Sequence, residues 1–97
     1  MKFHQDGTQP RPNEVFVFGS NLAGVHGAGA AKQAVKYGAR YGHGVGLQGL
    51  TYAIPTKDHD IKTLPIDKII PYIERFKKFT LDYPQAQFFV TRVEMYS

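Results

Sequence analysis

The sequence predicts a small three-layer α/β domain in which a mostly parallel sheet lies between helices. Apolar segments typical of buried strands alternate with helical segments in the order β-α-β-α-β, the pattern of parallel strands joined by helices. The 97 residues, of which 42% are hydrophobic, suffice for one domain with one core. We expect an irregular arm over residues 1–13 and a single domain over residues 14–97.

Three segments are expected to pair as parallel strands: Val15–Phe18, Leu50–Ile54 and Phe88–Val93. Val15–Phe18 is wholly apolar, which is typical of a strand that is covered on both faces. We expect this strand to break at Gly19. Because proline lacks an N–H group, we expect the second strand to end at Pro55 and a polar loop to follow it.

Helices are predicted near Ala28–Tyr41 and Asp67–Tyr83. The first segment is rich in alanine, and lysine and arginine recur on it at four-residue spacing, which is typical of a solvated stripe. The second has apolar residues at steps of three and four. Pro71 is tolerated only in a first helical turn, so we place the regular part of this helix from about Asp67.

A glycine-rich stretch joins the first strand to the first helix, and the sequence from Val15 to Ala31 reads VFVFGSNLAGVHGAGAA. Glycines let the backbone approach a ligand closely, and the first N–H groups of a helix can bind anions. The spacing is neither the dinucleotide fingerprint nor a P-loop. Two interpretations remain, a phosphate cradle and a flexible turn, and both require positive φ at one or more of Gly24, Gly27 and Gly29.

The charge distribution favours an anionic partner. The formal net charge is +4, and no Asp or Glu occurs between Glu14 and Asp58, whereas four basic residues do: Lys32, Lys36, Arg40 and Lys57. A nucleic-acid partner is not expected, because the chain has no dense basic run and its aromatic residues lie in segments predicted to form the core. Cysteine is absent, which excludes a disulfide or a thiolate zinc site.

The segments Asn21–Ala31 and Ile54–Lys57 carry a resemblance to a known family. The pattern N-x-x-G-V-x-G-x-G-x-A and the P-T-K sequence resemble macrodomains, which bind ADP-ribose. The nearest branch is that of the ADP-ribosyl glycohydrolases and their phage and bacterial relatives. The resemblance covers roughly residues 14–92 and implies a macrodomain-like fold and an ADP-ribose-like small molecule as ligand. The ligand-binding residues that we predict are Asn21, Gly24, Val25, His26, Gly27, Ala28, Gly29, Ala30, Thr56 and Lys57.

Three departures from the family pattern bear on activity. The lysine that can attack an ADP-ribosyl ester in the hydrolase branch is replaced here by Ala28. The early acidic residue that binds adenine has no counterpart in a strand-like context, since Asp6 lies in the arm. The second glycine-rich loop is missing, since Val93–Ser97 contains no glycine, and the chain resembles the first part of a longer domain. The resemblance therefore implies binding more than catalysis.

No catalytic residue can be assigned, although four side chains were considered for activating water or attacking the anomeric carbon: Asn21, His26, Asp58 and His59. We expect no metal, because no further ligand follows Asp58-His59-Asp60 at a recognisable spacing. We expect no cofactor, no membrane span and a cytoplasmic location, and we consider a homodimer. The alternative to ligand binding is a structural or interaction protein, phage-derived for example, that keeps the fold without a working site.

Overall fold

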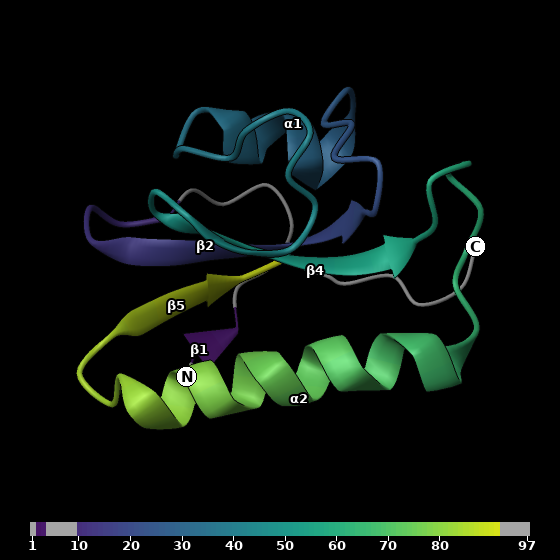
Figure 1. The fold of residues 1–97 in the computed structure, drawn as a ribbon. Helices are drawn as coiled ribbons and strands as arrows, with labels where there is room; N and C mark the ends of the chain where they lie inside the picture. Colours follow the sequence, from purple (N-terminus) through teal and green to yellow (C-terminus); the bar gives the residue numbers. More distant parts are fainter. Residues whose placement is uncertain (1, 4–9, 92–97) are drawn as a thin grey trace.

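The computed structural model describes residues 2–3 and 10–91. They form a small α/β domain in which a mixed sheet lies between two helices (Figure 1). The order of the strands across the sheet is β1-β5-β2-β4-β3, with β3 antiparallel to β4 and the other neighbours parallel. The elements along the chain are β1 (Lys2–Phe3), β2 (Glu14–Asn21), α1 (Gly29–Val35), β3 (Gly46–Gln48), β4 (Thr51–Lys57), α2 (Ile66–Asp82) and β5 (Gln87–Val90).

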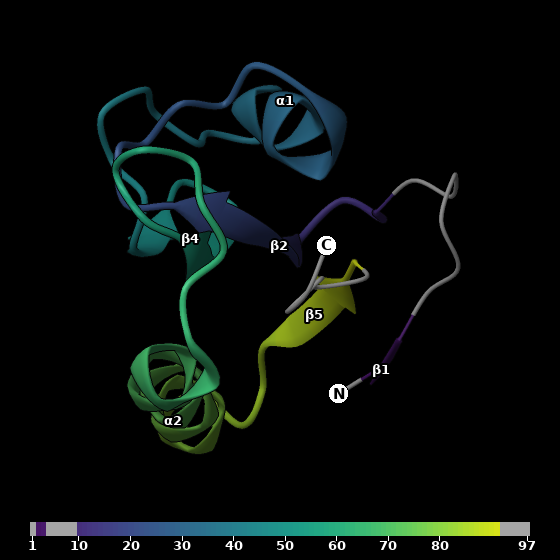
Figure 2. The same ribbon diagram turned by 90° about the vertical axis from the view of Figure 1, so that its right-hand side faces the viewer.

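Strand β2 separates two hydrophobic clusters, because its successive side chains point to opposite faces of the sheet. Val15 and Val17 pack with Phe76 on the face that α2 covers, whereas Phe16 and Phe18 pack with Ala34 on the face that α1 covers. Figure 2 shows the two helices on opposite sides of the sheet. The expected three layers are therefore present.

The parallel pairing predicted for the three main strands is confirmed. Strands β4 and β5 do not pair with each other, because each lies beside β2. The third strand ends at Val90, and the Thr91 N–H and hydroxyl group both donate to the Val17 carbonyl. The last two residues of the predicted third strand, 92 and 93, lie outside the described residues.

The predicted ends of the first two strands are wrong. Strand β2 does not break at Gly19 but continues to Asn21, and β4 runs through Pro55 to Lys57. The edge strand β3 pairs only with residues 51–53 of β4, so the missing N–H of Pro55 costs no hydrogen bond to β3. The residues Thr56 and Lys57, expected in a loop, are consequently held in the sheet.

The region between α1 and β4 also differs from expectation. The first helix ends at Val35 instead of Tyr41, because Gly38 adopts φ +117° and its N–H and that of Ala39 donate to carbonyls of the last helical turn. Gly46–Gln48 form the separate edge strand β3, which makes a hairpin with β4, and β4 begins at Thr51 instead of Leu50.

The expectation of a wholly irregular arm is wrong for Lys2–Phe3, which form β1 beside β5. Such a two-residue strand is too short to show a period-two pattern in the sequence.

Among the described residues, neither helix has the length and apolar character needed to cross a membrane.

The second helix is confirmed within one residue at each end. Its face toward the sheet contains the buried residues Ile69 and Phe76, and the ring centroids of Phe76 and Tyr52 are 5.0 Å apart. The expectation for Pro71 is wrong, because this residue is the sixth of the helix and lies beyond the first turn. Its exposed ring removes one backbone donor from the helix interior.

We predict that Pro71→Ala stabilises the domain by about 1–3 kcal/mol, since alanine restores the N–H donor and removes the steric clash with the preceding turn. Urea unfolding followed by circular dichroism would measure the change. Lys68→Ala, at another exposed position of the same helix, is the matched control and should change stability by less than about 0.5 kcal/mol. An unchanged or lower midpoint for Pro71→Ala would contradict the prediction.

Candidate functional site

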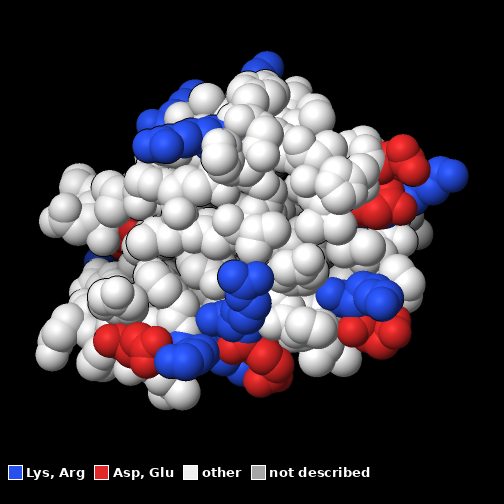
Figure 3. All heavy atoms as spheres, viewed as in Figure 1, with Lys and Arg blue, Asp and Glu red and all other residues white. Residues whose placement is uncertain are grey.

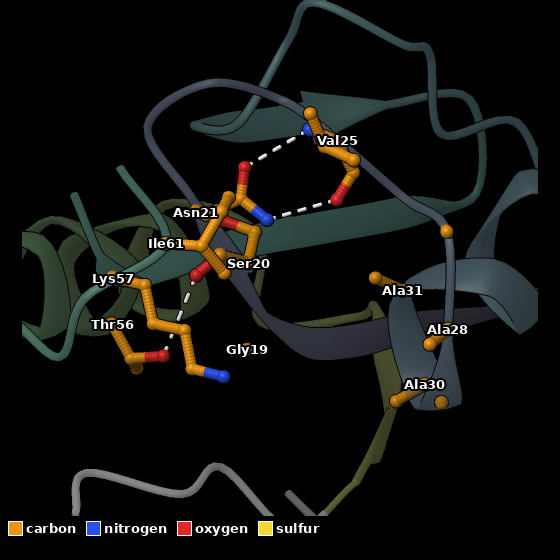
Figure 4. Close-up of a pocket in the computed structure, with 12 residues that line it drawn as sticks. Gly19, Ser20, Asn21, Val25, Ala28, Ala30, Ala31, Thr56, Lys57 and Ile61 are labelled. Atoms are coloured by element: carbon orange, nitrogen blue, oxygen red, sulfur yellow. Dashed lines mark hydrogen bonds between the residues drawn. The ribbon is translucent and has the colours of Figure 1, made fainter. Parts of the chain in front are cut away.

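A pocket of about 450 Å³ lies where β2 and β4 reach their carboxyl ends (Figure 4). Its volume falls within the range of small-molecule sites, and ligands of open α/β sheets bind at this edge. The pocket lies between the glycine-rich loop on one side and the end of β4 with its following turn on the other. The lining residues are Gly19, Ser20, Asn21, Val25, Gly27, Ala28, Gly29, Ala30, Ala31, Thr56, Lys57 and Ile61.

The structure brings together most of the residues that we predicted to bind a ligand. Eight of them line the pocket: Asn21, Val25, Gly27, Ala28, Gly29, Ala30, Thr56 and Lys57. Gly24 and His26 do not line it. Four further lining residues were not predicted from the sequence: Gly19, Ser20, Ala31 and Ile61. Ser20 directly follows the expected strand and could have been found from that position, whereas nothing in the sequence indicates Ile61.

Asn21 holds the glycine-rich loop in shape. Its side-chain nitrogen donates to the Val25 carbonyl at 2.8 Å, and its side-chain oxygen accepts from the Val25 N–H at 2.9 Å. Both polar ends of the amide are therefore engaged within the protein. Asn21 belongs to the wall of the pocket, and its paired hydrogen bonds support the shape of the loop.

The expected positive φ is confirmed at Gly24 (+71°) and Gly29 (+58°). The two glycines serve different ends. A Cβ atom on Gly24 would lie 2.4 Å from the carbonyl carbon of Gly42, so this glycine allows two loops to touch. A Cβ atom on Gly29 would meet no atom within 4 Å, and this glycine supports the turn into α1 beside the pocket.

The expected reach of His26 toward a ligand is not seen, because its side chain is fully buried away from the pocket. Its Nε2 donates to the Arg40 carbonyl at 2.8 Å, and the ring packs edge-on against Phe18 with centroids 5.6 Å apart. The Tyr41 hydroxyl donates to the His26 carbonyl. His26 thus connects the glycine-rich loop to the segment that follows α1.

Lys57 is the only titratable residue among the described residues that line the pocket. Its backbone continues β4 next to Asn21 of β2, and Figure 4 shows its amino group extending along the pocket. The neighbouring Thr56 is buried, and its hydroxyl donates to the Ser20 carbonyl at 3.4 Å. The Ser20 hydroxyl in turn donates to the Gly44 carbonyl. Lys57 is therefore the polar group best placed to meet a ligand.

The basic character predicted for this half of the chain is visible on the surface. Figure 3 shows Lys and Arg over α1 without Asp or Glu beside them, whereas both signs mix along α2. Two of the mixed pairs on α2 are Glu74 with Lys77 and Lys78 with Asp82. An anion that approaches the pocket from the α1 side thus meets little repulsion.

The turn after β4 is organised by Asp58. Its carboxylate accepts hydrogen bonds from the N–H groups of Lys62 and Asp60, at 3.0 and 2.8 Å, and the bond from Lys62 is the main cause of a lowered pKa of Asp58. These bonds favour the ionised form. Their contribution to stability is present above the ordinary carboxyl pKa and is lost as the pH falls through the lowered value.

Asp58 and His59, considered for catalysis in the sequence, do not line the pocket, and His59 is exposed. The described part of the chain contains no group of three or more His, Cys, Asp or Glu that could hold a metal ion. Ile61 of the same turn does line the pocket and adopts φ +61°, which is rare for a β-branched residue.

A search of family models, curated proteins and solved structures finds no match to this chain.

We predict that Gly44→Ala destabilises the domain by about 3 kcal/mol or more, because its Cβ atom would lie 1.9 Å from the Asn21 carbonyl oxygen. Gly27→Ala is the matched control. A Cβ atom there meets only a Val25 methyl group at 4.0 Å, and its φ is not positive. Thermal unfolding of the two variants would compare them, and equal midpoints would show that the close approach at Gly44 does not limit the fold.

Proposed function

We propose that this protein binds ADP-ribose or a related nucleotide diphosphate in the pocket at the ends of β2 and β4. The observation that carries the proposal is the composition of the pocket wall. The glycine-rich loop supplies backbone and small side chains, Lys57 supplies the one charge, and no lining residue among those described is a carboxylate. Such a wall attracts a phosphate group and does not repel it.

The shape of the loop supports the same ligand class. Gly27, Ala28 and Gly29 are exposed, so the backbone at the pocket is open to a ligand. No side chain caps the start of α1, and its first turn contains no acidic residue. The N–H groups of this turn have no acceptor within the helix and are available to phosphate oxygens. The resemblance of this loop to the ADP-ribose loop of macrodomains agrees with this chemistry.

Binding is favoured over catalysis. Hydrolysis requires a group that activates water or attacks the anomeric carbon. Among the described residues of the pocket wall there is no His, Cys, Asp or Glu, and the Ser20 hydroxyl is buried and engaged with Gly44. The loop position at which the hydrolase branch has a lysine is Ala28.

We predict that the wild-type chain binds ADP-ribose with a Kd of roughly 0.1–1 mM, and that Gly27→Glu abolishes this binding by placing a carboxylate beside the phosphates. Isothermal titration calorimetry would measure both. The backbone at Gly27 has room for a side chain, so the variant should fold. Gln85→Glu adds the same charge outside the pocket lining, at an exposed turn that leads into the amino end of β5, and should bind as the wild type does.

Lys57→Ala in the same titration should weaken binding about 10- to 100-fold, the value of one charge-assisted hydrogen bond. Unchanged binding by Gly27→Glu would exclude this pocket as the site. A wild-type chain that binds no ADP-ribose at all would favour the alternative, a structural or interaction protein.

We also predict that the purified chain releases no ADP-ribose from an ADP-ribosylated protein, because the described residues of the pocket wall include no His, Cys, Asp or Glu, and Ala28 occupies the loop position of the attacking lysine. Chromatography of the released nucleotide would test this, with an active glycohydrolase as positive control. Any turnover by the wild-type chain would contradict the prediction.

A further inference from the structure

We propose that Ile61 is a specificity-determining residue, which selects phosphate compounds that carry a nucleoside-type ring over inorganic phosphates. This inference rests on the proposed function of the pocket. The backbone conformation of Ile61 is unfavourable, and its side chain belongs to neither hydrophobic cluster. Ile61 adopts φ +61°, yet its side chain is 46% exposed and lines the pocket.

The conformation of Ile61 is fixed by the turn around it and not by its own side chain. The Ile61 N–H donates to the Asp58 carbonyl at 3.1 Å, and the Asp58 N–H donates to the Lys62 carbonyl at 2.8 Å. The Asp58 carboxylate adds two further hydrogen bonds to the turn. Glycine or asparagine would fit this left-handed position with less strain. The turn itself therefore gives no reason for a β-branched residue.

The side chain of Ile61 has a counterpart on the other rim of the pocket. Val25, on the glycine-rich loop, is 49% exposed and lines the same pocket (Figure 4). The position of Val25 is fixed by its two hydrogen bonds with Asn21. Two exposed apolar side chains on hydrogen-bonded turns thus border a pocket in which Lys57 is the one charged residue among the described lining residues. Apolar surface arranged in this way favours an uncharged ring that enters with the anionic group.

The ligand that fits this arrangement has two parts. Its phosphate groups lie against the loop backbone and Lys57, and a ribose or base covers the side chains of Val25 and Ile61. An inorganic phosphate or pyrophosphate uses only the first part. The apolar rim therefore adds affinity for the nucleotide and none for the inorganic anion.

Calorimetric titration with ADP-ribose and with inorganic pyrophosphate, combined with thermal unfolding, would test the proposal on Ile61→Gly. This variant removes the apolar side chain and relieves the backbone strain together. We expect a melting temperature equal to or above that of the wild type. The affinity for ADP-ribose should fall about 5- to 20-fold, which corresponds to the loss of one half-buried apolar side chain. The affinity for pyrophosphate should be unchanged. Ile61→Asn, which also tolerates the left-handed conformation, should show the same loss for ADP-ribose.

Asn13→Gly is the matched control. Asn13 has the second positive φ of a non-glycine residue in the described chain, +77°, and does not line the pocket. This variant should leave both affinities unchanged. The inference on Ile61 is overturned, and the proposed function stands, if the wild type binds ADP-ribose and Ile61→Gly binds it equally well or loses both ligands alike. A wild type that does not bind ADP-ribose overturns both.

Discussion

The burial of β2 on both faces is the constraint on which the rest of the structure depends. Its alternating side chains enter two separate clusters, one under each helix, and its backbone pairs with β4 on one side and β5 on the other. Phe16, Val17 and Phe18 are almost completely inaccessible to solvent. The carboxyl end of this strand, Ser20 and Asn21, is also part of the pocket wall. A strand that is buried on both faces therefore positions the site directly.

The glycine-rich loop is kept in place by contacts that leave its pocket side open. The Asn21 amide holds Val25, the His26 ring holds the Arg40 carbonyl, and Gly24 touches Gly42. Gly24 and His26 do not line the pocket, whereas Asn21 and Val25 are part of its wall. The contacts of Asn21, Gly24 and His26 thus fix the loop that contains the exposed stretch Gly27–Gly29, and a ligand would meet a preorganised backbone.

Local sequence patterns predicted the order of the main elements, the parallel pairing and the second helix. Eight of the ten residues that the family resemblance implied for ligand binding are among the twelve that line the pocket. What they missed depends on contacts between distant segments. The early end of α1 follows from Gly38, which packs closely against Gly49. A Cβ atom on Gly38 would lie 2.9 Å from the Gly49 Cα atom. Strand β4 continues through Pro55 because β3 ends first, and His26 is buried because the segment after α1 folds over it. Ile61 enters the pocket through a left-handed turn that its own residue type does not favour.

The short length of β3 has a consequence for self-association. A sheet edge with free N–H and C=O groups can pair with a strand of another molecule. Beyond the hairpin, β4 presents Pro55, which has no N–H, and the returning chain then covers the edge, since the Leu64 N–H donates to the Thr56 carbonyl and Thr63 bridges Lys57. On this side of the described sheet, edge-to-edge pairing is confined to the three residues of β3, where Leu47 is exposed. Pairing through β3 would take place beside residues 51–53 of β4, at the opposite end of this strand from the pocket residues Thr56 and Lys57.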